Sequence, residues 1–518
     1  MKPQNNPAHG ECCMTTPSTT TEMSAAAVAE VAAQARAAAD KLAHTTLAER
    51  LAAVKAISAY VLEHKEDIAD AVCRETRKTR TDALVSEVMG VLDNFEWLLH
   101  RAPKILADQK VPTPIALLGK KSRIYHQPLG VVLVISPWNY PLHIGITSIV
   151  AAFVCGNAVL FKPSEVTPLQ GLFERIFAAA PLLAQSVFVC YGGGETAQRL
   201  IDTQPAKIFF TGSARTGKRI LAQAAEKLIP VDLELGGKDA AIVFDSANLD
   251  RAVAGVMWGA LTNAGQSCSS LERIYVQAGV YDEFVRRLSA AVNGLVLNYG
   301  DSGDADIGGI TAAFQMDIIR RHVADARAKG ATQHTGGDVL AASEHIFQPT
   351  VLTNLHENML LMQEETFGPL LPVLKFDTEE EAVALANHSE FGLAASVWGG
   401  DKAQLERVTR RLVCGAVSVN NAMITEGNPN LPFGGTKASG HGRQKGAEGL
   451  LGYTRSKAVL YDGNSGKIEA NWYPYTQKKY HLFADLIDTL FGKSGIARLL
   501  GLIKTGTALE GEAKKPRG

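Results

Sequence analysis

The sequence predicts an α/β fold built from two doubly wound units and a small additional β element. Strand-like and helix-like stretches alternate in two successive series along the chain. Such alternation is the pattern of parallel sheets covered by helices. The strands are continuous apolar runs, such as VVLVIS at 131–136 and KIFFTGS at 207–213, as expected for strands buried on both faces. With 518 residues, of which 46% are hydrophobic, the chain is long enough for several domains with large cores.

We expect residues 1–23 to form a disordered leader, because they are polar, threonine-rich and without the apolar core of a secretory signal. At Ser24, which can cap a helix, the composition changes to strong helix formers, and helical patterns continue until the prolines at 112 and 114. The runs AVLFKPS and SVFVCYGGG are further strands. We assign 24–118 and 132–235 to the first domain.

The alternation repeats after Glu234, with the strands AAIVF, RIYVQ, LLPVLKF and SVWGG, so we assign 236–436 to a second α/β domain. The strand-like run YTRSKAVLYDGNSGK has too little apolar content for a core, and we expect it to pair with SRIYHQ. A protruding element made of 119–131 and 437–470 follows from this pairing. Its edges would recruit a second subunit, giving a homodimer or homotetramer.

Composition excludes several classes of function. The chain has 52 basic and 53 acidic residues and no stripe of interleaved basic and aromatic residues, which disfavours nucleic-acid binding. No stretch of eighteen residues is free of charge, which disfavours a spanning helix. Seven cysteines without zinc-type spacing indicate a reducing compartment and no metal site. We expect a cytoplasmic location.

Cys268, at the end of GQSC, and Glu234, in ELGGKD, are the candidate nucleophile and general base. A catalytic cysteine needs a polar, partly electropositive pocket that favours the thiolate, and Gln266 and Ser267 indicate a polar turn. Most cysteines are inert apolar side chains, and we read those in apolar stretches in this way. They are Cys73, Cys155, Cys190 and Cys414.

Four further motifs are each expected where a strand ends, which is where open α/β sheets bind ligands. They are PWNYP at 137–141, KPSE at 162–165, FTGSARTG at 210–217 and EETFGP at 364–369. In the first, Asn139 could donate toward negative charge developing on oxygen. FTGSARTG lacks the GxGxxG spacing, so a simple strand-to-helix turn is an equal alternative, and a solvated turn is the alternative for KPSE.

Together these residues resemble the NAD(P)-dependent aldehyde dehydrogenase superfamily over residues 25 to 470. PWNYP, GNAVLFKPSE, FTGS, LELGGKD, GQSC, EETFGP and PFGGTKASG occur in the family's order. The resemblance implies an aldehyde-dehydrogenase-like fold and oxidation of an aldehyde to a carboxylic acid with NAD as hydride acceptor. Cys268 would form a thiohemiacetal whose oxyanion accepts from Asn139, and Glu234 would activate the water that hydrolyses the thioester.

The resemblance also implies that the first domain binds the dinucleotide. Lys162 and Glu165 would contact the adenine ribose, Ser213 the pyrophosphate, and Glu365 and Phe367 the nicotinamide side. The expected cofactor-binding residues are Ile135, Ser136, Pro137, Trp138, Lys162, Ser164, Glu165, Gly193, Thr211, Gly212, Ser213, Gly217, Leu235, Gly236, Glu365 and Phe367. The Glu165 carboxylate would repel a ribose phosphate, which favours NAD over NADP.

The substrate and two alternatives stay open. Leu261 stands where many members of the family place an aromatic ring, and no arginine beside PWNYPLH would hold a second carboxylate, so we favour a plain aliphatic or aromatic aldehyde over a semialdehyde acid. One alternative is a CoA-acylating relative, although such relatives generally lack the carboxylate at Glu234. The other is a catalytically silent scaffold.

Residues 471–518 form an expected amphipathic extension beyond the usual end of the family's fold. Apolar residues recur at helical spacing between 482 and 491, and the cluster IARLLGLI follows between Lys493 and Lys504. A helical hairpin that lies in a membrane interface is one interpretation. A helix that covers the protein's own surface or a partner subunit is the other.

Overall fold

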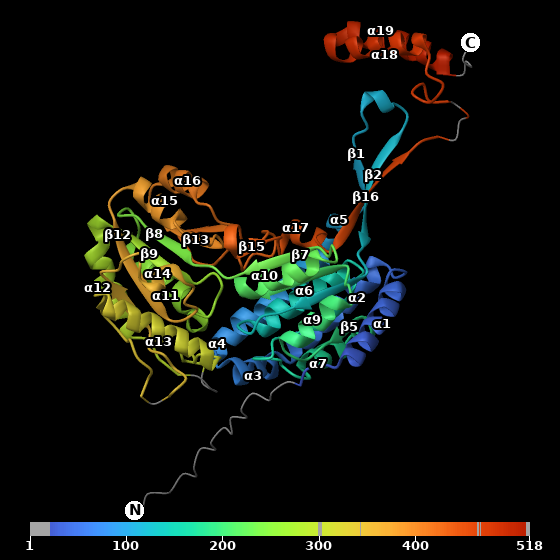
Figure 1. Cartoon of the computed structure of the whole chain (residues 1–518). Coiled ribbons are helices and arrows are strands. Elements are labelled where there is room, and N and C mark those ends of the chain that lie inside the picture. Colours follow the sequence, from blue (N-terminus) through green and yellow to red (C-terminus); the bar gives the residue numbers. More distant parts are fainter. Residues whose placement is uncertain (1–20, 299–302, 342, 464–465, 467, 514–518) are drawn as a thin grey trace, which may run out of the picture. The chain divides into compact units, whose positions relative to one another are not determined.

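The computed structural model describes residues 21–513 except 299–302, 342, 464–465 and 467. Most of the expected leader, residues 1–20, lies outside the described residues. The chain divides into two compact units, one running up to Asp108 and from Tyr125 to Lys457, the other made of Gln109–Ile124 and the residues from Ala458. The α/β fold class is confirmed (Figure 1).

A six-stranded sheet forms the core of the first half of the larger unit. Its order is β15-β7-β6-β3-β4-β5, and all neighbours are parallel except β15, which pairs antiparallel with β7. The four strands expected from apolar runs are confirmed. The bounds are β3 (Val131–Ile135), β4 (Ala158–Lys162), β5 (Val187–Val189), β6 (Lys207–Gly212), β7 (Val231–Leu235) and β15 (Gly440–His441).

Alternate residues of these strands enter two different cores. In β3, Val132 and Val134 pack with α2, α5 and α6 on one face of the sheet. Leu133 and Ile135 pack with α1, α9 and α10 on the other face. Both faces are therefore covered by helices, as an apolar parallel sheet requires. These helices are α1 (Ala25–Leu42), α2 (Leu47–Glu63), α5 (Gly90–Ile105), α6 (Pro141–Val154), α7 (Leu172–Ala178), α8 (Pro181–Ala184), α9 (Gly194–Asp202) and α10 (Ala214–Ala225).

The N-terminal helices begin where the sequence indicates. The Ser24 side chain accepts from the N–H of Ala27, and Thr46 with Glu49 forms a capping box at the start of α2. A π-helix at Ala83–Met89, which the sequence did not predict, joins α4 (Arg80–Asp82) to α5. The helix α3 (Lys65–Thr76) precedes them. The π-helix carries Glu87, which is fully buried.

A seven-stranded sheet forms the second core, in the order β10-β11-β12-β9-β8-β13-β14, and only β10 is antiparallel to its neighbour. The strands are β8 (Asp239–Val243), β9 (Leu271–Gln277), β10 (Thr332–Gln333), β11 (Thr350–Thr353), β12 (Leu370–Phe376), β13 (Ala394–Trp398) and β14 (Ala416–Val419). Its helices are α11 (Leu249–Leu261), α12 (Tyr281–Asn293), α13 (Ala313–Ala328), α14 (Leu360–Gln363), α15 (Glu379–Asn387) and α16 (Lys402–Arg411). The second alternation expected after Glu234 is confirmed.

The expected pairing of SRIYHQ with the run after Tyr453 is confirmed. In a three-stranded sheet, β2 (Lys121–Pro128) lies between β1 (Gln109–Val111) and β16 (Thr454–Tyr461). The strand bounds differ from the expected element 119–131 and 437–470 at two points. β1 belongs to this sheet, and Gly440 and His441 instead pair with β7 in the six-stranded sheet, followed by α17 (Gly446–Leu451).

The smaller unit ends in two helices, α18 (Gln477–Gly492) and α19 (Gly495–Ala513), which pack against each other. Lys478 at the start of α18 forms an ion pair with Glu512 near the end of α19, at 3.0 Å. The predicted helical hairpin in 471–518 is therefore present among the described residues. In the described part of the chain, no helix combines the length and the apolar character needed to cross a membrane.

Candidate active site

A cavity of about 820 Å³ opens at the carboxyl ends of β3, β4, β6 and β7. Parallel strands that end at one edge bring PWNYP, KPSE and FTGSARTG together there, as predicted. Every expected cofactor-binding residue lines this cavity except Gly193 and Gly217. Residues that were not predicted to bind the cofactor line it as well. They are Phe210 and Arg215 of the FTGSARTG motif and, outside the predicted motifs, residues including Ile144, Gln198, Arg219, Phe314 and Gln315.

Gly193 and Gly217 have other contacts. The N–H of Gly193 donates to the carboxylate of Glu22 at 3.1 Å, and Glu22 also accepts from the N–H of Thr196 at the start of α9. A Cβ on Gly217 would lie 2.7 Å from Leu235 Cδ2, so a glycine there lets α10 pack closely on β7. Neither glycine lines the cavity, and their expected role in cofactor binding stays a prediction.

One end of the cavity carries a lysine and a carboxylate. Lys162 Nζ lies 2.7 Å from Glu165 Oε2, with the lysine side chain buried and the glutamate side chain 49% exposed. Close by, the Ser213 side chain caps α10 by accepting from the N–H of Thr216 at 3.3 Å. The unpaired N–H groups of that helix start give a positive potential at this end.

The other end has aromatic walls. The Trp138 ring lies edge-on to Phe367, with centroids 5.2 Å apart, and to Phe314 at 6.1 Å. Beside them, Glu365 Oε1 accepts from the N–H of Gly237 at 3.1 Å. A Cβ on Gly236 would lie 2.3 Å from Glu365 Oε2, so a larger residue here would require the Glu365 carboxyl to move. Burial raises the pKa of Glu365 to about 8, and the neighbouring Glu272 adds to this.

The segment EETFGP corrects one prediction, because it does not follow a strand. It lies between α14 and the start of β12 at Leu370. Its backbone is held by Glu272, which accepts from the N–H of Thr366 at 2.8 Å and of Phe367 at 2.7 Å. Lys238 in turn pairs with Glu272 at 2.8 Å. Neither Lys238 nor Glu272 was singled out from the sequence.

Glu234 and Cys268 both line the cavity. Glu234 is buried at the end of β7, and among the described residues neither of its carboxylate oxygens has a hydrogen-bond partner. Burial therefore raises its pKa well above the ordinary value, Arg443 opposes this shift and Asp232 adds to it. A carboxyl group whose pKa is raised in this way is a stronger base than an ordinary carboxylate when it is ionised.

The surroundings of Cys268 correct the expectation of an electropositive pocket. Cys268 is partly exposed as a residue, but burial raises the pKa of its thiol well above the ordinary value, and four carboxylates add to the shift. In order of effect they are Glu426, Asp239, Glu365 and Glu234. Glu426 accepts a hydrogen bond from Ser269, and the nearby cation is Lys445, whose own pKa is lowered by burial. These residues come from distant segments, so the GQSC run alone could not reveal them.

Asn139 lies against the loop that carries Cys268. Its side chain is buried, and Nδ2 donates to the carbonyl of Gln266 at 3.0 Å. One hydrogen of that amide is thus used to join the two loops. The second hydrogen is available to an oxygen atom bound near the thiol.

Glu426→Gln should accelerate alkylation of Cys268 by iodoacetamide by more than about twofold above pH 7. The substitution removes the carboxylate that raises the thiol pKa most, so the pKa should fall. Below pH 7 the two proteins should react alike, since the pKa of Glu426 is about 7 and the wild-type carboxyl is then protonated. Peptide mass spectrometry of Cys268 over pH 6 to 10 measures this. Glu406→Gln, on the exposed face of α16, is the control, and equal rates for all three proteins at pH 9 would contradict the assignment.

Comparison with known proteins agrees with this geometry. The family model for the aldehyde dehydrogenase family matches residues 2–459. The chain is 39% identical over 450 residues to 4,4'-diapolycopene aldehyde oxidase of Methylomonas sp, covering 86% of this chain and 84% of that protein. It is 37% identical to the mitochondrial succinate-semialdehyde dehydrogenase of Mus musculus, covering 78% and 77%.

A solved structure leads to the same family. The NAD+ complex of aldehyde dehydrogenase from Bacillus cereus is 30% identical, with a TM-score of 0.79, and the match covers 85% of this chain and 90% of that one. The resemblance in the motifs, the α/β architecture and the cavity agree with these matches. The chain therefore belongs to the aldehyde dehydrogenase family and is an NAD(P)-dependent oxidoreductase that converts an aldehyde to a carboxylic acid.

Proposed function

We propose that Cys268 is the nucleophile of this oxidation, Asn139 the oxyanion donor and Glu234 the base that activates water. The observation that carries the proposal is that Cys268, a partly exposed residue, lines one cavity with Glu234, whose buried carboxyl has no hydrogen-bond partner in the described part of the chain. The amide that could stabilise an oxyanion lies on the loop next to the thiol. Chemistry at a carbonyl needs these three groups together.

The residues present fit a dinucleotide. The end with Lys162 and Glu165 suits a ribose, the capped start of α10 suits a pyrophosphate, and the Trp138 and Phe367 walls suit a flat ring beside Cys268. The nicotinamide cofactor, when bound, supplies the acceptor for the hydride that the aldehyde carbon loses.

The side chains of the chain itself carry the remaining steps. The Cys268 thiol loses its proton to solvent and its sulfur bonds to the aldehyde carbon as the C=O π bond breaks. The carbonyl oxygen, now an anion, accepts from the Asn139 amide. Loss of hydride from this carbon leaves a thioester on Cys268. Glu234 then takes a proton from a water molecule whose oxygen attacks the thioester, so that the carboxylic acid leaves and the thiol is restored.

Water rather than CoA is the acyl acceptor in this proposal, because Glu234 lies in the same cavity as Cys268 and has no other partner among the described residues. The same pair argues against a catalytically silent scaffold. A buried carboxyl without a hydrogen bond lowers the stability of the fold. In a protein without catalytic activity, Glu234 would have this cost with no function to offset it.

We also propose NAD as the preferred cofactor and an aldehyde without a second carboxylate as the substrate. The half-exposed Glu165 would repel a phosphate on the ribose. Above pH 7 the Glu426 carboxylate, whose pKa is about 7, would repel a negative group on an aldehyde bound at Cys268. The similarity to a 4,4'-diapolycopene aldehyde oxidase supports the same choice.

Steady-state kinetics should therefore give kcat/KM at least about tenfold higher for NAD than for NADP, and higher for neutral aldehydes than for ω-carboxy aldehydes of the same length. NADH formation at 340 nm measures both ratios. Comparable kcat/KM for the two cofactors would remove the first preference, and faster oxidation of the carboxy aldehydes would remove the second.

Glu234→Gln should produce one burst of NADH per active site and then stall, because acylation of Cys268 does not need the base whereas hydrolysis does. Cys268→Ala should form no NADH at all. Rapid mixing with an aldehyde and saturating NAD records the burst, and Glu195→Gln on the exposed start of α9 serves as the control. Undiminished steady turnover of the Glu234→Gln enzyme would show that another group is the base.

For the C-terminal hairpin we propose peripheral contact of a cytoplasmic enzyme with a membrane surface. Both helices expose large apolar side chains, and cations lie among them at Lys493, Arg498 and Lys504, an arrangement suited to an anionic lipid surface. The exposed apolar residues are Ile487, Phe491, Ile496, Leu499, Leu500 and Ile503, of which Phe491 is 82% exposed. Assembly into a homodimer or homotetramer through the edges of the three-stranded sheet is part of the same proposal.

A chain truncated after Tyr475 should lose cosedimentation with vesicles that contain anionic lipid and should keep its aldehyde oxidation. The full chain should bind such vesicles, and binding should weaken as salt is raised. Light scattering of both forms should give a dimer or tetramer. If the truncated chain sediments with vesicles as the full chain does, the hairpin is not the anchor.

A further inference from the structure

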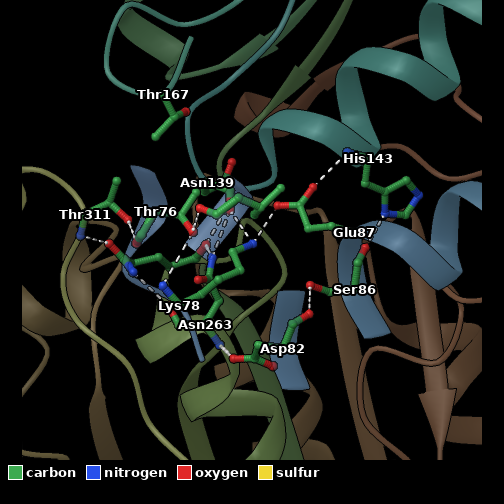
Figure 2. A network of polar contacts seen from close by, with 12 residues as sticks. Thr76, Lys78, Asp82, Ser86, Glu87, Asn139, His143, Thr167, Asn263 and Thr311 are labelled. Carbon is green, nitrogen blue, oxygen red and sulfur yellow. Dashed lines mark hydrogen bonds and ion pairs between the residues drawn. The ribbon is translucent and has the colours of Figure 1, made fainter. Parts of the chain in front are cut away.

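Lys78 is buried beneath the proposed oxyanion site with its side chain fully shielded from solvent. Figure 2 shows its amino group between two partners. It lies 2.7 Å from Glu87 Oε1 and donates to the backbone carbonyl of Asn139 at 3.0 Å, and it lies 4.2 Å from the centre of the Tyr140 ring. Two of these contacts, to the Asn139 carbonyl and to the Tyr140 ring, are with the loop that carries the Asn139 side chain.

Glu87 fixes the other side of the same peptide segment. One of its oxygens pairs with Lys78, and the other accepts from the N–H of His143 at 2.8 Å, in the first turn of α6. The loop that holds Asn139 is thus bonded to the pair at its carbonyl and again four residues later. Glu87 reaches this position from the π-helix between α4 and α5.

The loop that carries Cys268 is also hydrogen-bonded to the segment from Lys78 to Glu87. Asn263, Ala264 and Gly265 have φ values of 51°, 56° and 73°, a left-handed stretch that costs energy at the two residues with a Cβ. Asp82 holds it by accepting from the N–H of Asn263 at 2.9 Å, and Asn263 Nδ2 donates to the carbonyl of Asn139 at 3.1 Å. The carbonyl of Asn139 therefore accepts from both Lys78 and the nucleophile loop.

A buried ion pair adds little net stability, because the cost of removing two charges from water offsets their attraction. We infer that the Lys78–Glu87 pair acts here by fixing the orientation of the Asn139 peptide. Two donors on one carbonyl fix the plane of the Asn139 peptide, and that plane sets the direction of the amide Nδ2 that also bonds Gln266. An error of about 1 Å at such a donor is enough to lose a large part of its stabilisation of a transition state.

We propose that Lys78, held by Glu87, is a positioning residue that aligns the Asn139 amide with the carbonyl oxygen attacked by Cys268. This inference rests on the proposed function, because it takes Asn139 as the oxyanion donor. It assigns a role to a residue that touches neither substrate nor cofactor.

A double-mutant cycle tests the proposal. Lys78→Met keeps the length and bulk of the side chain and removes its charge, and it should lower kcat for aldehyde oxidation by about 10- to 100-fold while KM for NAD changes by less than about threefold. In an Asn139→Ala background the same substitution should lower kcat by less than about threefold, because the group through which Lys78 acts is gone. Equal losses in both backgrounds, or no loss in the wild-type background, would overturn it.

Further measurements separate positioning from a damaged fold. Alkylation of Cys268 by iodoacetamide needs only the thiol, so its rate should change by less than about twofold in Lys78→Met. The matched control is Lys65→Met, which changes an exposed lysine of α3. If Lys78→Met does not fold, Glu87→Gln should give a smaller loss of kcat with the same dependence on Asn139, and independence of Asn139 would refute the proposal. A wild-type chain without aldehyde-dependent NADH formation would instead contradict the proposed function itself.

Discussion

The desolvation of Glu234 is the constraint on which the proposed chemistry depends. Its carboxyl group lies at the end of a central parallel strand, buried and without a hydrogen-bond partner among the described residues, and its pKa is raised as a result. A carboxylate in water would be too weak a base to remove a proton from a water molecule efficiently. Burial beside Cys268 makes it stronger, and the same burial raises the pKa of the thiol, so both groups gain reactivity as the pH rises.

The positions of these groups follow from the sheet. Because β3, β4, β6 and β7 run parallel in one sheet, their carboxyl ends lie at a common edge. The polar residues that follow these strands consequently line one cavity. The segment before β12 closes the opposite wall, and Lys238 with Glu272 holds its backbone. Thr76–Glu87, far from both in sequence, bonds to the loops of Asn139 and Cys268. The catalytic loops are therefore fixed from outside the cavity.

Features that depend on local pattern could be predicted from the sequence. Apolar runs such as VVLVIS became buried strands, Ser24 became a helix cap, and the polar residues after three strands lined one cavity. Features that depend on residues distant in sequence could not be predicted. The charge around Cys268 comes from Glu426, Asp239 and Glu365, and the buried Lys78–Glu87 pair depends on a π-helix that no local pattern indicated. Gly193 and Gly217 matched the pattern but bond or pack elsewhere.

The central claim is that the sulfur of Cys268 forms the covalent intermediate and that Glu234 removes it. Intact-protein mass spectrometry of the Glu234→Gln enzyme, quenched after incubation with NAD and an aldehyde, tests this most directly. The account predicts an adduct with the mass of the acyl group, located by peptide mapping on Cys268 and absent when NAD is omitted. An acyl group on a different residue, or an unmodified Cys268 in an enzyme that has formed NADH, would contradict it.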